Sequence, residues 1–321
     1  MLKYALRRLW ETVPTTVGIV VLSFVLFNVV GGSPAETILG KNASARSVAA
    51  FNAKWGYDKP LLIGDWSAEK GIAGLFDSQF FRFVGDLAVG DLGYSIENGE
   101  KVADVLKRGV GPSLSLTVPI LAGGVVVALM LALLSAAYRG KWVDRTVMMV
   151  STVLMSVNYV IWVLAGQYFL SYKAGWFPVW GYESAWNLAL PVFIGIVSSL
   201  GVDVRFFRTV VLDELYRPYV LTLRAKKVPG AAIMVRHVLR NALIPVVTYV
   251  SLSIPYLFTG SLLLESFFGI PGLGSVSINA IHSADMAVVR SVVVLGALMY
   301  QFVNLATDLI YALLDPRVRL G

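Results

Sequence analysis

The sequence predicts an all-α integral membrane protein with six transmembrane helices. Hydrophobic residues make up 57% of the 321 residues and charged residues only 15%, which is too apolar for an ordinary soluble domain. The charged residues are also unevenly spaced, and long uncharged runs separate them. The chain contains no cysteine, which excludes disulfides and thiolate metal sites.

A helix that crosses a hydrocarbon core of about 30 Å needs roughly 20 mostly apolar residues. Uncharged runs of suitable length occur in six places, and we expect one span between each of these pairs of charged residues: 11 and 36, 108 and 139, 145 and 173, 183 and 203, 240 and 265, and 290 and 308. The first run resembles a secretory signal, but its apolar part is longer than the usual core of about 7–15 residues. We therefore predict an uncleaved first helix.

The distribution of Lys and Arg predicts that both termini are cytoplasmic, because cytoplasmic segments retain positive charge. A cytoplasmic N-terminus places these basic groups on the inner side: Lys3, Arg7 and Arg8; Arg139, Lys141 and Arg145; the cluster at 205–240; and Arg317 and Arg319. The long segment 31–111 carries charges of both signs and is predicted to be external and partly folded. This topology explains the net charge of +7 without nucleic-acid binding.

Catalytic motifs are absent from the sequence. It contains no G-x-x-x-x-G-K-[ST] phosphate loop, so ATP is not expected to bind to this chain in that way. His237 and His282 fall on opposite sides of the predicted topology, so no shared metal site is expected. We predict no catalytic residue, no metal site and no cofactor bound by this chain.

The segment PYVLTLRAKKVPGAAIMVRHVLRNALIPVVT, residues 218–248, concentrates positive charge between the fourth and fifth spans. The pair Pro229-Gly230 interrupts helical hydrogen bonding, which predicts two short helices set at an angle. One interpretation is a basic interfacial helix that contacts anionic lipid headgroups. The other is a docking helix for a soluble partner. The residue chemistry leaves both open.

Six stretches along the chain are informative when taken together: LKYALRRLWETVPTTVGIVVLSF, WGYDKPL, GDLGYSI, LRAKKVPGAAIMVRHVLRNALIPVVT, GSLLLESFFGIPGLG and NLATDLIYALLDPRVRLG. In this order they resemble the permeases of ABC importers of the dipeptide/oligopeptide (peptide/nickel) family. The resemblance covers nearly the whole chain and is to the B-type subunit, which has a long external loop after its first helix. This resemblance implies the type I ABC importer permease fold, with a cytoplasmic coupling helix between spans four and five.

The resemblance also implies an organisation and a set of partners. It divides the chain into a cytoplasmic end with the first helix (1–30), an external loop region (31–111), a five-span permease core (112–314) and a cytoplasmic tail (315–321). The implied partners are a second homologous permease, two ATP-binding subunits that hold ATP and Mg, an extracytoplasmic solute-binding protein and the lipid of a prokaryotic inner membrane. Closure of the ATPase pair would drive alternating access.

The family's coupling contacts, transferred to this chain, fall on one short element in which small and apolar residues would enter a groove of the ATPase. The element comprises Leu223, Arg224, Ala225, Lys226, Lys227, Val228, Pro229 and Gly230. The chain departs from its relatives at two positions. Lys227 stands where they usually carry glycine, and Asn158 stands where many carry a proline in span three.

Polar residues within spans are candidates for the translocation path, because an unpaired polar group facing lipid is costly. Five are of this kind: Ser151, Ser156, Asn158, Gln167 and Ser199. The alternative for each is a hydrogen bond between helices, which Ser, Asn and Gln commonly form in membrane bundles. Asp308 is the only acid expected deep in a span.

The resemblance favours an importer of di- and oligopeptides, with a nickel chelate, glutathione or another small solute as alternative cargo. Two hypotheses from other classes are considered. A proton-driven secondary carrier would use Asp308, although a structural ion pair with an inner Arg is the expected role of that residue. A purely structural membrane scaffold would show no ligand-stimulated ATPase activity in its assembly.

Overall fold

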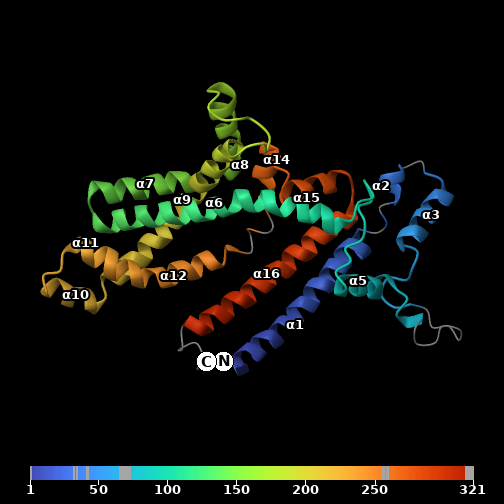
Figure 1. The fold of residues 1–321 in the computed structure, drawn as a ribbon, viewed down its shortest axis with the longest axis horizontal. Coiled ribbons are helices and arrows are strands. Elements are labelled where there is room, and N and C mark those ends of the chain that lie inside the picture. The colour runs from blue at the N-terminus through green and yellow to red at the C-terminus, as the bar shows by residue number, and fades with distance from the viewer. Residues whose placement is uncertain are drawn as a thin grey trace. The chain divides into compact units, whose positions relative to one another are not determined.

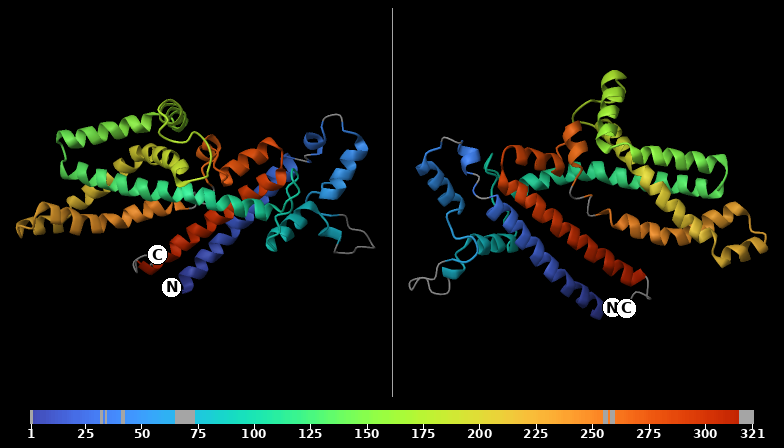
Figure 2. Two further views of the ribbon diagram at one scale, coloured as in Figure 1. Left: turned by 45° about the horizontal axis from the view of Figure 1, so that its top comes forward. Right: turned by 180° about the vertical axis from the view of Figure 1, so that it is seen from behind.

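The computed structural model describes residues 2–31, 33, 35–40, 43–64, 74–254, 257 and 260–314, and of residues 2–6, 37 and 308–314 only the backbone. Throughout these ranges the regular structure is helical, and the only β pairing is a single bridge between Tyr94 and Lys101. The chain forms two compact units: unit 1 comprises Met1–Gly111 and Gly272–Gly321, and unit 2 comprises Pro112–Pro271. Figures 1 and 2 show the elements of each.

The predicted all-α membrane class is confirmed. Five helical segments among the described residues are long and apolar enough to cross a bilayer: Arg7–Val30, Val102–Ala137, Ala185–Leu215, Gly230–Ser251 and Met286–Thr307. A further segment consists of two helices, Trp142–Ser156 and Tyr159–Lys173, which are bent by 92° at a short break. Each of the six uncharged runs therefore contains helix, but the run at 145–173 is not one straight span.

In unit 1 the first and last helices pack along each other (Figures 1 and 2). Helix α1 (Leu2–Phe24) continues as the π-helix η1 (Val25–Val30), and α16 runs over Met286–Leu314. The Nε2 of Gln301 donates to the Oγ1 of Thr15 at 2.7 Å, and Phe24 and Val294 share a buried cluster with Phe83. The last predicted span therefore belongs with the first.

The segment between α1 and α6 is partly helical, as predicted, and a buried carboxylate anchors its last part. It contains α2 (Ala35–Leu39), α3 (Ala45–Trp55) and α5 (Gln79–Ala88). Between α15 (Leu273–His282) and α16, the Asp285 carboxylate accepts from Ser95 Oγ at 2.5 Å, from the Ile96 amide at 3.1 Å and from the Val288 amide at 3.3 Å. One side chain thus caps α16 and fixes the loop that carries the GDLGYSI stretch.

Unit 2 is built around α9 (Ala185–Leu215), which packs against α7 (Trp142–Ser156), α8 (Tyr159–Gly166) and α12 (Leu239–Ser251). The long helix α6 (Val102–Ala137) begins in unit 1 and belongs to unit 2 from Pro112 onward. Glycines permit the close approach: a Cβ at Gly201 would lie 2.8 Å from the Ser151 carbonyl oxygen, and one at Gly195 would lie 2.5 Å from Ile120. Small residues at contacts let membrane helices pack backbone to backbone.

The break between α7 and α8 occurs at Asn158, the position where the resemblance led us to expect a proline. Asn158 has an extended backbone, and its side-chain oxygen accepts from the Val160 amide at 2.9 Å, so it is the N-cap of α8. Before the break, Ser156 Oγ donates back to the Thr152 carbonyl at 2.8 Å. An asparagine cap therefore produces the bend without a proline.

The stretch GSLLLESFFGIPGLG contains α14 (Leu262–Phe268), which a buried carboxylate and a closely packed glycine fix in place. The Glu265 side chain is fully buried and accepts from Ser113 Oγ at 2.8 Å and from the Ser261 amide at 2.9 Å. Helix α14 ends at Gly269, where φ is +68° and an added Cβ would lie 2.1 Å from the Trp180 ring. Only glycine satisfies both the positive φ and the close ring.

We predict that Gly269→Ala lowers the free energy of unfolding by about 3 kcal/mol, because backbone strain and a clash with Trp180 add together. Thermal unfolding of the detergent-solubilised protein measures the loss. Gly18→Ala in α1 is the matched control, since nothing lies within 4 Å of its added Cβ. Equal melting temperatures for the two variants would contradict the assignment.

Candidate functional site

The basic segment is interrupted at Pro229-Gly230, as predicted, but only the first of its two helices is short, because the second continues from Gly230 to Ser251. Helix α10 (Pro218–Ala225) begins with proline at its first turn, where the missing amide costs nothing. Pro229 is the N-cap of the next helical stretch, which runs through α11 (Gly230–Ala232) and the π-helix η3 (Ile233–Val238) into α12. We call residues 218–240 the 218–240 loop.

The turn after α10 is a Schellman motif with Lys227 in the left-handed conformation. The Lys227 amide donates to the Arg224 carbonyl at 2.9 Å, and the Val228 amide donates to the Leu223 carbonyl at 3.1 Å. The φ of Lys227 is +57°, which costs a residue with a Cβ roughly 1–2 kcal/mol and costs glycine almost nothing. Glycine, which the resemblance led us to expect at this position, would adopt this conformation without strain.

The apolar residues of the 218–240 loop divide between two faces. Val220 is fully buried, and Leu223 and Val228 pack on the same cluster, so they attach the loop to unit 2. Leu221 is 65% exposed, and Ala225, four residues later on the same face of α10, is exposed as well. Leu221 was not among the coupling residues expected from the sequence. An apolar residue type alone does not show which side of a short helix is covered by neighbouring helices.

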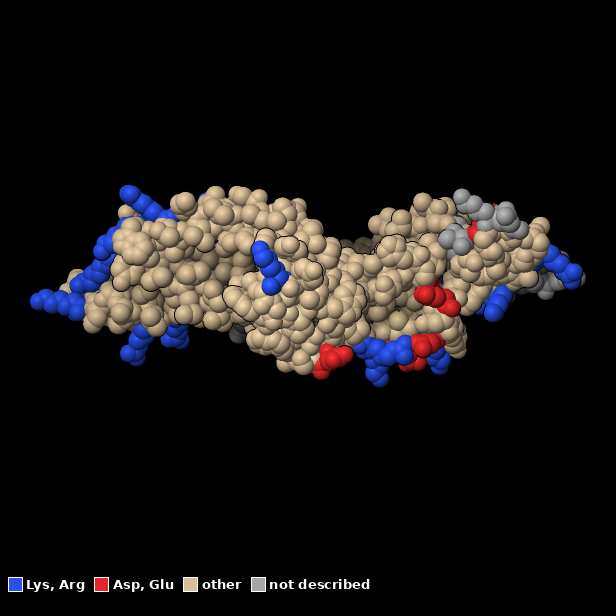
Figure 3. Space-filling model, turned by 90° about the horizontal axis from the view of Figure 1, so that it is seen from above, with Lys and Arg blue, Asp and Glu red and all other residues tan. Residues whose placement is uncertain are grey.

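Positive charge surrounds this exposed face. In Figure 3, Lys and Arg gather at the end of unit 2 where α10 and the α6–α7 turn lie, at the left of the view. The guanidinium of Arg139, in that turn, lies 5.0 Å from the centroid of the Tyr216 ring, just before α10. Two basic segments predicted to share one side of the membrane therefore lie together. Exposed cations at this end include Arg139, Lys141, Arg145, Arg217, Arg224, Lys226 and Lys227.

Tyr219 links the start of α10 to its neighbours. Its hydroxyl donates to Glu214 Oε2 at 3.1 Å, and the same side chain hydrogen-bonds Asn241 at the start of α12. Desolvation raises the pKa of Tyr219 above its ordinary value of 10, so the phenol stays protonated at neutral pH and remains a donor. The loop is thus connected to α9 and to α12 by one side chain.

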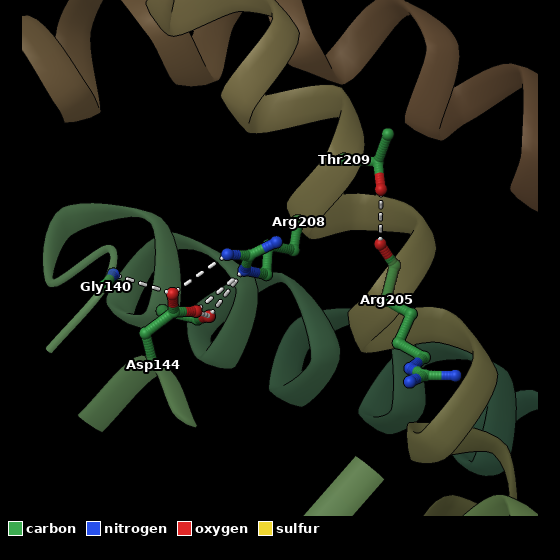
Figure 4. A network of polar contacts seen from close by, with 6 residues as sticks. Gly140, Asp144, Arg205, Arg208 and Thr209 are labelled. Atoms are coloured by element: carbon green, nitrogen blue, oxygen red, sulfur yellow. Dashed lines mark hydrogen bonds and ion pairs between the residues drawn. The ribbon is translucent and has the colours of Figure 1, made fainter. Parts of the chain in front are cut away.

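An ion pair and its hydrogen bonds join helices α6, α7 and α9 (Figure 4). Arg208 of α9 donates twice to Asp144 of α7, from Nε at 2.8 Å and from Nη2 at 2.9 Å. The same carboxylate accepts from Ser135 Oγ of α6 at 2.5 Å and from the Gly140 amide at 2.9 Å. The Asp144 and Arg208 side chains are only 8% and 19% exposed, so the pair is largely shielded from water.

This network makes α6, α7 and α9 one body at the end that carries the 218–240 loop. Helix α9 leads into α10 with only a short turn at Tyr216 and Arg217 between them. Helix α10 is therefore connected, through α9 and Arg208, to the α6–α7 pair. We call Asp144, Arg208, Ser135 and Gly140 the brace.

A cavity of about 520 Å³ lies in unit 2 and is lined by residues of α6, α8, α9, α12 and α14 and of the segment between α12 and α14. Of the five candidate path residues, only Ser199 lines it. Ser151 is buried against Gly201, and Gln167 Nε2 donates to the carbonyls of Val179 at 3.0 Å and Phe267 at 2.8 Å. Ser156 and Asn158 form the α7–α8 break described above. The structure therefore brings one candidate to the cavity, places Ser151 and Gln167 in contacts between helices, and leaves Ser156 and Asn158 exposed at the α7–α8 break.

Two polar residues of this cavity, Asp203 and Tyr249, were not expected. The fourth span was expected to end at Asp203, but α9 continues to Leu215 as one candidate membrane helix. Asp203 therefore lies within a helix long enough to span a membrane, whereas the position of Asp308 deep in a span stays a prediction. The Asp308 side chain and the tail 315–321 lie outside the described residues.

The geometry thus defines a class: a helical membrane protein in which unit 2 carries a cavity among its helices and an exposed basic loop at the end where the brace joins three helices. A profile described as "Binding-protein-dependent transport system inner membrane component" matches residues 83–320, and its companion N-terminal profile matches residues 1–117. The chain belongs to this family, the permeases of ABC importers of the peptide/nickel group, and has the type I permease fold.

Curated relatives match along the full length. The glutathione transport system permease protein GsiC of Escherichia coli O6:H1 is 30% identical over 320 residues, and the protein of that name from Salmonella paratyphi A is 31% identical over 320 residues. In both cases 99% of this chain and 99% of the relative are covered. The chain is therefore an inner-membrane permease subunit that works with separate ATP-binding and solute-binding components.

We predict that Lys227→Gly stabilises the protein by about 1 kcal/mol, which corresponds to a melting temperature roughly 2–4 °C higher, because it removes left-handed strain. Lys226→Gly is the control: the φ of Lys226 is −77°, so glycine relieves nothing there and lowers stability. Thermal unfolding in detergent measures both. A lower melting temperature for Lys227→Gly would refute the role of strain.

We also predict that Asp144→Ala costs about 3–5 kcal/mol of stability, because it leaves the Arg208 guanidinium buried without its counter-charge. Arg208→Met combined with Asp144→Ala should cost less than the sum of the single changes. Asp213→Ala, at an exposed acid of the same helix, should be nearly neutral. Additive losses in the double variant would show that the two side chains act independently.

Proposed function

We propose that this permease subunit carries short peptides inward, either di- and oligopeptides or a tripeptide such as glutathione. The relatives that match over 99% of their length are named as glutathione transport permeases, and glutathione is itself a small peptide. This full-length similarity supports a peptide cargo over the nickel chelates that the same family includes. Another small solute would be the alternative if peptides fail as substrates.

The proposed assembly is that of a binding-protein-dependent importer. This chain pairs with a second homologous permease, two ATP-binding subunits hold ATP and Mg, and an extracytoplasmic binding protein delivers the cargo. Both termini are cytoplasmic in this proposal, since the basic loop and the basic α6–α7 turn lie together at one end of unit 2. The functional division is the one proposed above: 1–30, 31–111, 112–314 and 315–321.

Coupling to ATP is proposed to act through the 218–240 loop, over residues 223–230 together with Leu221. The observation that carries this proposal is the exposed apolar pair Leu221 and Ala225 on α10, surrounded by cations. An apolar centre with a charged rim is typical of a protein interface. When the ATP-binding subunits close, α10 moves with them, and α9 and the brace transmit the movement to the helices around the cavity.

A proton-driven carrier is not proposed, because the family to which the chain belongs uses a binding protein and an ATP-binding component. Asp308 serves as a check on this choice. Uptake by the complete importer should require its ATP-binding subunits and should persist in Asp308→Asn. Uptake that is independent of those subunits would favour the carrier instead.

We predict that Ala225→Glu reduces peptide uptake by about tenfold or more while the protein remains in the membrane, since a buried, unpaired charge disrupts an interface. Uptake of labelled alanyl-alanine by cells, with binding-protein-stimulated ATPase activity in proteoliposomes, measures coupling. Thr222→Glu places the same charge at the edge of this exposed face, about 100° around α10 from Leu221 and about 60° from Ala225, and should have a smaller effect. Wild-type uptake in Ala225→Glu would refute docking at this face.

A further inference from the structure

Asp203 is an acidic side chain in a membrane-length helix, and it faces the cavity of unit 2. Its carboxylate accepts from the Tyr249 hydroxyl at 2.9 Å and hydrogen-bonds Ser199. The Tyr249 ring is itself fixed, stacked on Phe206 at 4.5 Å and edge-on to Phe207 at 5.8 Å between centroids. The position of the carboxylate is therefore determined by aromatic packing on α9 and α12.

Among the described residues, no cation forms an ion pair with Asp203. The two nearby arginines of α9 have other partners. Arg205 donates to Thr152 Oγ1 at 3.1 Å and contacts the Met155 sulfur at 3.7 Å, and Arg208 is held by Asp144 in the brace (Figure 4). Unit 2 thus neutralises the acid of α7 and leaves the acid of its cavity without a counter-charge.

A carboxylate in a membrane span is costly unless it is paired, so such residues are characteristic of solute and ion pathways. The cavity suits a small solute: its volume of about 520 Å³ is within the usual range for ligand sites. Its walls offer hydroxyl groups from Thr117, Ser198 and Ser199. Glycines keep it open, since a Cβ at Gly124 would come within 3.1 Å of Ser199 Oγ.

We propose that Asp203 recognises a positively charged group of the transported solute, such as the ammonium group of a peptide, as it passes through unit 2. Tyr249 positions the carboxylate, and the neighbouring hydroxyls accept the remaining ammonium hydrogens. The identity of the solute rests on the proposed function. The preference of the cavity for cations does not rest on it, so the cation preference and the identity of the solute can be tested separately.

The absence of cysteine allows a direct measurement of the charge in the cavity. Ser199→Cys places the only thiol of this chain beside Asp203 in the importer purified with its native partners, and modification is followed on this chain by mass spectrometry. The probes are two methanethiosulfonates, one with a trimethylammonium group and one with a sulfonate. The cationic probe should react faster relative to the anionic one, and Asp203→Asn should lower that ratio by about tenfold or more.

Two controls separate this effect from a general change. Thr222→Cys, among the cations of α10, should favour the anionic probe whether or not Asp203 is replaced. Tyr249→Phe removes the hydrogen bond but keeps the charge, so the ratio at Ser199→Cys should persist. A ratio that Asp203→Asn leaves unchanged would overturn the proposal, because the carboxylate would then be protonated or paired by a partner subunit.

Uptake by cells that carry the complete importer tests the consequence for transport. Asp203→Asn should reduce uptake of labelled alanyl-alanine by about tenfold, Asp203→Glu should retain most of it, and Asp213→Asn, at an exposed acid of α9, should have no effect. Normal uptake in Asp203→Asn would refute the recognition role and leave the peptide function standing. Failure of the unaltered importer to take up peptide would refute the peptide function, and the thiol measurement would still decide the cavity's charge preference.

Discussion

The ion pair between Arg208 and Asp144 fixes the end of unit 2 that carries the 218–240 loop. It joins α6, α7 and α9 with five charge-assisted or polar hydrogen bonds in a region largely closed to water. Helix α10 is continuous with this body through the turn at Tyr216. Breaking a shielded, hydrogen-bonded ion pair is costly, so these three helices keep one arrangement at the end that carries the 218–240 loop.

The polar residues of unit 2 fall into two groups with different physical consequences. Asp144, Glu265 and Gln167 are satisfied by donors or acceptors from other helices, so they act as fixed junctions. Asp203 is held by Tyr249 and faces a cavity, and no described cation balances its charge. The first group stabilises the unit, whereas the Asp203 carboxylate, in our proposal, binds a positively charged group of the solute.

The two positions at which the chain differs from the pattern expected by resemblance both have a local physical account. Asn158 ends α7 and caps α8, so a side-chain hydrogen bond accompanies the bend without a proline. Lys227 adopts a left-handed φ that glycine adopts without strain, and two Schellman hydrogen bonds hold it there. In both cases backbone requirements are met by a different residue, at a modest cost in stability at Lys227.

The sequence by itself determined the all-helical membrane class, the six apolar runs, the paired helices of the 218–240 loop and the family, because hydrophobic length, Pro-Gly breaks and ordered motifs are local properties. It did not determine which side of α10 is covered, so Leu221 was missed. It also ended a span at Asp203, since a charge in sequence does not show whether the helix continues. Only the tertiary structure decided these points, because burial, the Arg208–Asp144 pair and the cavity at Asp203 arise from helices far apart in the chain.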